Sequence, residues 1–286
     1  TINQPNTSEN SFEENKYIGM NISLENIREI KLPEGFTPIS AWSSDSIRFL
    51  ALKGSNLYII DTRNNNATTF VTTLPTTANQ YFAWSWDDTK IYYYGMRDEE
   101  RFNNREVNKV DIATGDIVRN FPISFNGIEN FAQAKKPTDL VVYTNPDTKD
   151  LVARERDGTN ETVLMKEAHF IPIFLTPDRS KVFFKSTGFC PIYQINTCPE
   201  TSGQFPGSIT SLNPEGTLFL SDNRASDDGL SIRESDLLIT TADGSKIWEL
   251  TDTPNHLEMG PKFLPSGTSL TFTGESFGDA TSKLFI

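Results

Sequence analysis

The sequence predicts an all-β protein, a six-bladed β-propeller of four-stranded antiparallel blades whose N-terminal strand closes the last blade. One short pattern, two apolar strands joined by a polar turn, recurs along the chain. Its interval suits a four-stranded propeller blade. No apolar stripe at helical spacing persists for more than two turns, so the remaining segments are also expected to be strands and loops.

The repeated unit is clearest in its first two copies, ISAWSSDSIRFLAL at 39–52 and FAWSWDDTKIYYY at 82–94. Each copy continues with a third strand and a fourth, as in NLYIIDTRNN at 56–65 and TTFVTTL at 68–74. The turns between third and fourth strands are rich in Asp and Gly, which tolerate the backbone angles of tight hairpins. The central turn residues are separated by 42, 50, 41, 37 and 51 positions, and they are Asp45, Asp87, Pro137, Asp178, Glu215 and Ser266.

The two ends of the chain complement each other. The sixth repeat stops at SKLFI, residues 282–286, and lacks a fourth strand, whereas NIREIKLP at 26–33 is a spare strand before the first repeat. Pairing these two segments would close the ring and remove an exposed sheet edge. The predicted propeller spans 26–286, with blades at about 35–75, 76–123, 124–167, 168–206, 207–252, and 253–286 plus 26–33.

The last two repeats carry a more specific signature. Residues 219–229 and 235–274 contain F-x-S, an Arg, a strand ending in Asp-Gly, a Leu-Thr pair and a Pro-Ser-Gly turn. This combination resembles the TolB-type propeller repeat, although Ser266 replaces the usual Asp of the turn. The resemblance implies an exported, often periplasmic protein that binds other proteins or serves as an accessory module. The matching residues build turns and blade contacts in that family and are not catalytic: Phe219, Ser221, Arg224, Asp243, Gly244, Leu250, Thr251, Pro265, Ser266 and Gly267.

Charge and hydropathy indicate which partners are disfavoured and where in the cell the protein is expected. The 286 residues carry a net charge of −12, which disfavours nucleic acid as the main partner. No apolar stretch reaches the roughly 20 residues that a membrane-spanning helix needs. The chain starts at Thr1 rather than Met, as would an exported protein whose signal peptide has been removed, although a cytosolic fragment would start in the same way. We expect an exported protein, either periplasmic or at the cell surface or extracellular. Residues 1–25 are predicted to be a flexible leader, which could also carry a lipid or surface tether.

Cys190 and Cys198 are the two cysteines of the chain. An oxidising compartment would favour a disulfide between them. A straight strand over 191–197 would hold their Cα atoms about 26 Å apart, beyond the reach of a disulfide. The bridge therefore requires a turn between them, and the sequence leaves both arrangements open.

Three polar connections join second strands to third strands, at 95–106, 221–236 and 274–282. They should project from one side of the ring, which we call the loop face, and long loops on a rigid scaffold often carry function. Solvated loops without a binding role are the alternative. The candidate binding residues are Arg97, Arg101, Arg105, Arg224, Asp227, Asp228 and Arg233.

Aromatic residues are expected mainly between blades. Tyr92, Tyr93 and Tyr94 are consecutive, so their rings should alternate between the two faces of one strand. The four tryptophans are also interpreted as packing between blades, with a carbohydrate-stacking platform as the alternative: Trp42, Trp84, Trp86 and Trp248.

The leading functional interpretation is a non-enzymatic binding module, because no nucleophile, zinc or P-loop motif is found. The expected partner is a protein, with a glycan as the alternative, and no cofactor or metal is predicted. The competing interpretation is a carbohydrate-binding protein or a lyase or hydrolase with its site at the mouth of the central channel. It would use the two histidines, each just before an inner strand, near a carboxylate: His169 and His256 with Glu258 or Glu129.

Overall fold

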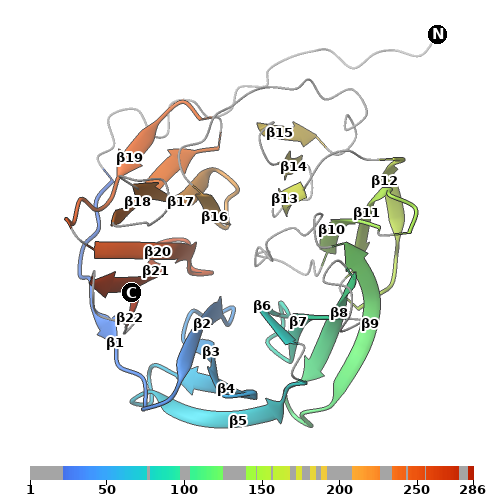
Figure 1. Cartoon of the computed structure of the whole chain (residues 1–286), viewed down its shortest axis with the longest axis horizontal. Coiled ribbons are helices and arrows are strands. Elements are labelled where there is room, and N and C mark those ends of the chain that lie inside the picture. The colour runs from blue at the N-terminus through green and yellow to red at the C-terminus, as the bar shows by residue number, and fades with distance from the viewer. Residues whose placement is uncertain are drawn as a thin grey trace.

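A computed structural model of the chain describes the ring but not every residue. The described residues are 22–75, 78–96, 104–124, 140–145, 147–155, 157–167, 172–175, 181–184, 188–191, 208–225, 234–242, 244–254, 256–276 and 283–286. Their regular structure consists entirely of strands, arranged around a central opening as in a β-propeller (Figure 1).

The first half of the ring contains three antiparallel groups of strands. The first group is β2 (Thr37–Trp42), β3 (Arg48–Lys53), β4 (Asn56–Asp61) and β5 (Ala67–Thr73). The second is β6 (Ala78–Trp84), β7 (Lys90–Met96), β8 (Asn104–Asp111) and β9 (Ile117–Ser124). The third is β10 (Leu140–Thr144), β11 (Leu151–Glu155) and β12 (Thr162–Met165).

The second half completes the circle. A three-stranded sheet contains β13 (Pro172–Leu175), β14 (Lys181–Phe184) and β15 (Gly188–Pro191). The next group, here the penultimate group, is β16 (Ser208–Leu212), β17 (Leu218–Ala225), β18 (Glu234–Thr241) and β19 (Ile247–Glu249). The closing group is β20 (His256–Phe263), β21 (Leu270–Ser276), β22 (Lys283–Phe285) and β1 (Glu29–Ile30). A single parallel bridge between Ser235 and Leu257 joins these last two groups into one eight-stranded sheet.

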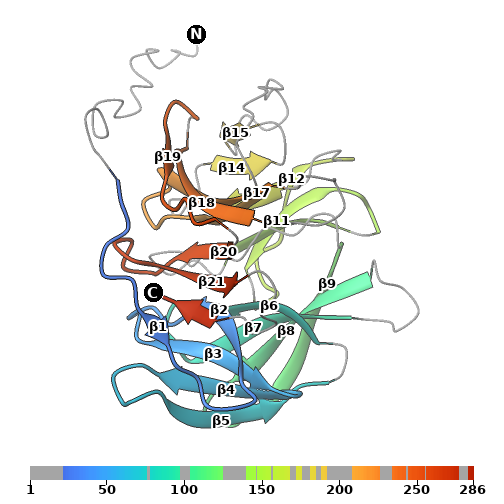
Figure 2. The same cartoon turned by 60° about the vertical axis from the view of Figure 1, so that its left-hand side comes forward.

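The predicted closure of the ring is confirmed. β1 pairs antiparallel with β22, with Glu29 opposite Phe285 and Ile30 opposite Leu284. The amides of Arg28 and Ile286 each donate to the other's carbonyl, at 2.9 and 3.0 Å. Figures 1 and 2 both show the blue β1 beside the red β22 at the C-terminus. The propeller fold follows from this arrangement, whereas the count of six complete blades stays a prediction, because the described third and fourth groups have three strands each.

The core lies in layers between neighbouring groups of strands. Tyr93 belongs to the cluster between the first and second groups, while Tyr92 and Tyr94 belong to the cluster on the other side of β7. The three consecutive tyrosines therefore serve two layers, as the strand period requires. Trp42 and Trp84 are also buried, as predicted, but the prediction for Trp86 is wrong, because it lies in a turn and is half exposed.

In the first and second groups, a short polar turn holds the first strand to the second strand. The Ser85 hydroxyl donates to Asp87 at 2.6 Å, and the Thr89 amide and hydroxyl donate to the same carboxylate oxygen. Ser43 and Asp45 repeat this arrangement in the first group. This side of the ring, opposite the loop face, is called the turn face below.

One turn residue also connects two groups. Asp88 accepts hydrogen bonds from the amide and hydroxyl of Ser44, at 2.9 and 2.8 Å, and from Arg48 Nη2 at 3.0 Å. The Arg48 guanidinium lies over the Trp84 ring, 5.2 Å from its centroid. The turn face is thus fastened between the first and second groups by one partly buried carboxylate.

Ring closure predicts the stability of a variant in β22. Leu284 is 1% exposed and packs with Ile30 and Leu264. We expect Leu284→Ala to lower the free energy of unfolding by about 3 kcal/mol, because it leaves a cavity at the closure. Urea denaturation measures the change, with Ile247→Ala as the control, since Ile247 is 53% exposed on an outer strand. Equal losses in the two variants would contradict the role of the closure.

Acid stability should depend on the turn carboxylates. Burial alone would raise the pKa of Asp87, but hydrogen bonds from Ser85 and Thr89 and the charge of Lys90 outweigh it and hold the pKa below 3.8. The stabilisation from the ionised carboxylate is therefore present above pH 3.8 and is lost as the pH falls through the lower folded-state pKa. The free energy of unfolding should therefore decline as the pH is lowered from 4, and we expect this decline to be smaller in Asp87→Asn. Urea denaturation at a series of pH values measures it. The same decline with pH in both proteins would refute this expectation.

Candidate functional site

The boundary between the penultimate and closing groups, here called the seam, contains the groups that make up the candidate site. Its centre is apolar, with Leu220, Leu237 and Ile239 packed against Leu270 and Phe272. Polar and charged groups lie at both ends of this apolar layer. A cavity lies at its turn-face end, and an acidic cluster lies at its loop-face end.

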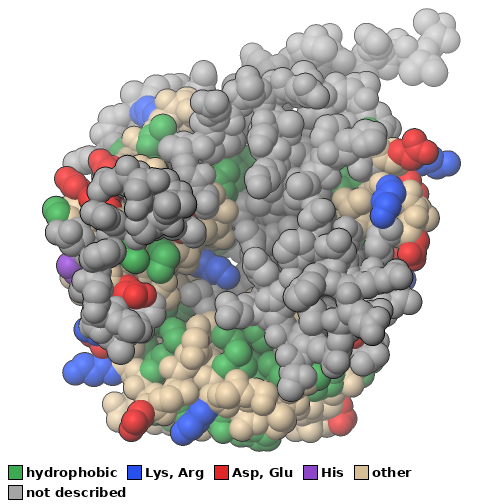
Figure 3. All heavy atoms as spheres, viewed as in Figure 1, with side chains coloured by type: hydrophobic (Ala, Val, Ile, Leu, Met, Phe, Trp, Pro, Cys, Tyr) green, Lys and Arg blue, Asp and Glu red, His purple; other side chains and the backbone are tan. Residues whose placement is uncertain are grey.

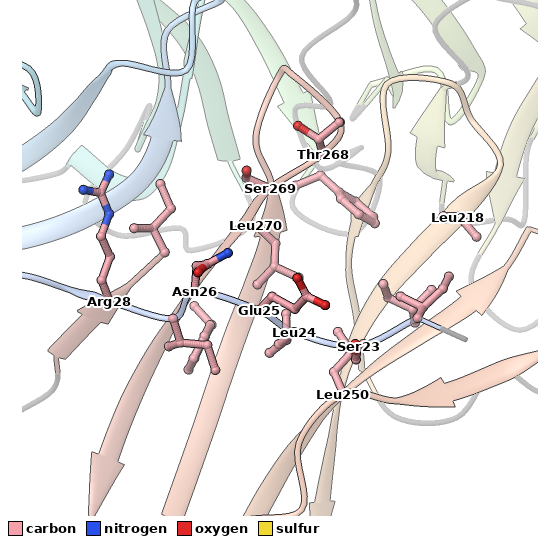
Figure 4. Close-up of a pocket in the computed structure, with 17 residues that line it drawn as sticks. Ser23, Leu24, Glu25, Asn26, Arg28, Leu218, Leu250, Thr268, Ser269 and Leu270 are labelled. Atoms are coloured by element: carbon pink, nitrogen blue, oxygen red, sulfur yellow. The ribbon is translucent and has the colours of Figure 1, made fainter. Parts of the chain in front are cut away.

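The N-terminal segment covers the seam at the turn face. Residues 22–28 run across the ends of the strands, and Ile22 and Leu24 pack against the apolar layer. Figure 4 shows Ser23, Leu24, Glu25 and Asn26 on this segment, with Leu250 and Leu270 on the strand groups beside it. The described part of the predicted leader, residues 22–25, thus contacts the propeller.

A cavity of about 540 Å³ lies between this segment and the seam. Its walls are mainly aliphatic and aromatic, and polar side chains of the segment and of the turn before β21 supply the rest. This volume is within the range of small-molecule sites. The sequence signal that could have indicated it is the alternation of Ile22 and Leu24. The lining residues are Ile22, Ser23, Leu24, Glu25, Asn26, Ile27, Arg28, Leu218, Ile239, Leu250, Phe263, Gly267, Thr268, Ser269, Leu270, Phe272 and Ile286.

Hydrogen bonds fasten β20, the inner strand of the closing group, to β17 and β18 of the penultimate group. The Asp222 carboxylate, fully buried on β17, accepts from the Gly260 amide at 3.1 Å. Gly260 has a φ of 59°, in the left-handed region that favours glycine, at an irregularity in the pairing of β20. The Ser235 hydroxyl donates to the carbonyl oxygen of Glu258 at 2.9 Å. These bonds fix the height at which β20 lies against β17 and β18.

Three carboxylates gather where the seam meets the loop face. Glu234 and Asp236 lie at the start of β18, and Asp252 follows β19, which pairs with β18. One oxygen from each lies within 4.8 Å of the others. Asp236 accepts a hydrogen bond from the Thr253 amide at 3.3 Å, which holds the segment after β19 against β18. We call Glu234, Asp236 and Asp252 the acidic trio.

The acidic trio was not predicted from the sequence. Asp252 is 16 positions beyond Asp236, and only the pairing of β18 with the segment that follows it brings them together. The arrangement is strongly anionic, and its oxygens could bind an ammonium, a guanidinium or a divalent cation.

Comparison with known proteins identifies the fold. No known protein family and no curated protein matches the sequence. Among solved structures, an oligogalacturonate lyase from Vibrio parahaemolyticus has a TM-score of 0.52 at 17% identity, over 88% of this chain and 76% of that one. TolB from Acinetobacter baumannii has a TM-score of 0.53 at 14% identity, over 77% of this chain and 55% of that one. The chain has a TolB-like propeller fold.

A third similar structure, an oligogalacturonate lyase in complex with manganese, has a TM-score of 0.53 at 16% identity, over 85% of this chain and 74% of that one. The TolB-like propeller therefore resembles both TolB and enzymes of the oligogalacturonate lyase type. Identities this low establish the fold alone. Within the described residues, no helix is long and apolar enough to cross a membrane.

The residues predicted for the channel mouth are only partly described. His256 begins β20, and its Nδ1 lies 3.2 Å from the carbonyl oxygen of Pro254. Glu258 follows two residues later and is 8% exposed, and its Oε2 has no hydrogen-bond partner among the residues that the structure describes. His169 and Glu129 lie outside the described residues, so the expected convergence of the two imidazoles stays a prediction.

The loop-face prediction needs correction at two positions. Arg105 lies in β8, opposite Met96, and Arg224 lies in β17, opposite Ser235, so both are strand residues rather than loop residues. The strands extend further toward the loop face than the turn residues suggested, because backbone pairing continues past the apolar segment. Cys190 lies in β15, whereas Cys198 lies outside the described residues, as do Arg97, Arg101, Asp227, Asp228 and Arg233.

The clamp between Asp222 and Gly260 can be tested by removing its acceptor. We expect Asp222→Ala to lower the free energy of unfolding by about 1–3 kcal/mol, because the Gly260 amide loses its partner. Asp222→Asn keeps a side-chain oxygen and should lose less. Urea denaturation of the TolB-like propeller and both variants measures this difference, and equal losses would rule out the hydrogen bond as the cause.

Proposed function

We propose that this chain is a non-enzymatic binding module that takes a protein partner at its loop face, with the acidic trio receiving a basic side chain of that partner. One observation carries the proposal. The three carboxylate oxygens lie within 4.8 Å of one another. The ion pairs found among the described residues lie elsewhere, on Arg48, Arg63 and Arg154.

Carboxylates held this close repel one another, and a cation placed among them relieves the repulsion. A lysine or arginine of a partner protein would supply that cation and would also be steered by the negative net charge of the chain. Complementary charge of this kind contributes to association rate and specificity. The acidic trio therefore favours a partner with a basic surface.

The position of the acidic trio supports the same function. It lies where β17 leads into β18, on the side of the ring at which β7 leads into β8 and β21 into β22. Connections on one face of a rigid ring commonly carry binding residues. The loop-face arginines and the location outside the cytoplasm, which the TolB resemblance implies, belong to this proposal as well.

The test compares two triple variants with equal charge change. Glu234→Gln, Asp236→Asn and Asp252→Asn together neutralise the acidic trio. Glu29→Gln, Asp116→Asn and Glu215→Gln neutralise three exposed acids away from it. Partners are captured from an extract of the source cells, identified by quantitative mass spectrometry, purified and titrated against each protein.

We expect the affinity for the purified partner to fall at least tenfold in the acidic-trio variant and to stay within about twofold in the control. Raising the salt concentration should weaken binding of the unaltered chain more than that of the acidic-trio variant. Equal affinity of the three proteins, or an equal loss in both variants, would refute the acidic trio as the contact.

A divalent cation is the second candidate for the acidic trio, and with it an enzymatic function. Carboxylate oxygens suit manganese, magnesium and calcium. One of the similar structures is an oligogalacturonate lyase in complex with manganese. Calorimetric titration with manganese chloride and calcium chloride alone separates the candidates. Saturable binding that the acidic-trio variant loses would favour the cation site.

A further inference from the structure

A second charged position, independent of the proposed function, lies at the centre of the ring. β20 is the inner strand of the closing group, in which β1, β22, β21 and β20 follow one another, and only the single bridge to β18 continues the sheet beyond it. It contacts the inner strand of the neighbouring group, because the Thr210 hydroxyl donates to the Pro261 carbonyl oxygen at 2.5 Å and the Phe263 amide donates to the Ser211 hydroxyl at 3.1 Å. Residues 261–263 are therefore among the innermost of the ring, beside the central opening of Figures 1 and 3.

Lys262 and Thr271 occupy the same side of this inner edge. They are direct partners in the pairing of β20 with β21. Their neighbours Phe263 and Leu270, also partners, contact the apolar layer of the seam on the other face. Because successive side chains of a strand alternate between faces, Lys262 and Thr271 point away from the seam.

Both side chains have an unused polar group. Thr271 is 0% exposed, and within the described part of the chain its hydroxyl has no hydrogen-bond partner. Lys262 is partly buried and pairs with no carboxylate, hydroxyl or carbonyl of the described residues. Burial lowers the pKa of the Lys262 ammonium, because removing an ammonium from water disfavours its charged form.

We propose that Lys262 and Thr271 form an anion site in the central channel and bind the carboxylate of a small ligand. The ammonium supplies the charge and the hydroxyl supplies a second donor on the same side of the strands. A carboxylate has one negative charge and two oxygens, so it matches one cation and one hydroxyl. A dianion such as phosphate would leave a negative charge uncompensated in a poorly hydrated place, which is costly.

The proposal is tested by ligand-dependent stability. Urea denaturation of the full chain is followed at constant ionic strength while sodium acetate replaces sodium chloride, with inorganic phosphate as a second comparison. A ligand that binds the folded state raises the unfolding free energy in a saturable way. Triglycine and its C-terminal amide, used in the same way, distinguish a free small carboxylate from the carboxylate of a peptide.

Three variants locate the effect. Lys262→Met removes the charge at similar length, Thr271→Val removes the hydroxyl at similar size, and Lys283→Met removes an exposed charge from β22 of the same group. We expect acetate to stabilise the unaltered chain and the Lys283→Met control equally. Acetate affinity should fall at least tenfold in Lys262→Met and about threefold to tenfold in Thr271→Val.

The outcomes are decisive in either direction. Acetate stabilisation that depends on both Lys262 and Thr271 supports the site, and triglycine shows whether peptide carboxylates also enter. No stabilisation beyond chloride, or equal stabilisation in all variants, overturns it. Should Lys262→Met fail to fold, Thr271→Val alone decides, because unchanged acetate affinity in that variant contradicts the paired site.

Discussion

Backbone pairing between the two ends of the chain is the constraint on which the rest of the structure depends. Arg28 and Ile286 exchange two hydrogen bonds, and β1 covers the edge that β22 would otherwise expose. Each layer of the core lies between two groups of strands, so the ring has to be closed for the first group to pack against the last. Ile30, Trp42 and Leu284 share such a layer. Closure also brings the N-terminal segment across the seam, where it forms one wall of the cavity.

At the seam, apolar packing and polar contacts have different roles in joining two groups of strands. The apolar layer supplies the burial, while Asp222, Gly260 and Ser235 set the position of one group against the other. Hydrogen bonds with such geometry are directional, whereas apolar contacts are not. The height of β20, and with it the position of Lys262, therefore depends on a few polar contacts near the loop-face end of the same strand.

Charges of opposite sign lie toward opposite faces of the ring in the two groups that form the seam. The acidic trio lies at the loop face on the outer strands of the penultimate group, while Lys262 lies near the turn-face end of an inner strand. The two proposals draw on one principle, that a charge with no ion pair among the described residues favours an oppositely charged group from outside. Their tests use separate residues, so either proposal can fail without affecting the other. The fold does not choose between them, because similar propellers include a lyase and TolB.

The sequence by itself determined the strands, the turns and the closure. Alternation placed Tyr92 and Tyr94 on one face and Tyr93 on the other, and the short turns around Asp45 and Asp87 follow from Ser and Asp hydrogen bonding nearby amides. A missing last strand and a spare first strand predicted the pairing of residues 26–33 with the C-terminus. Local patterns suffice for such features because the interacting residues are close in sequence or are fixed by strand count.

Only the tertiary structure decided where the charged side chains meet. Asp222 and Gly260 are 38 positions apart, and Lys262 is informative only beside the unpaired hydroxyl of Thr271. The burial of a side chain, the register of its strand and the charges around it are set when groups of strands pack. A short sequence pattern does not predict them. The same reason explains the corrected predictions. Arg105 and Arg224 lie in strands because backbone pairing extends to them, and Trp86 is half exposed because it lies in the turn before β7.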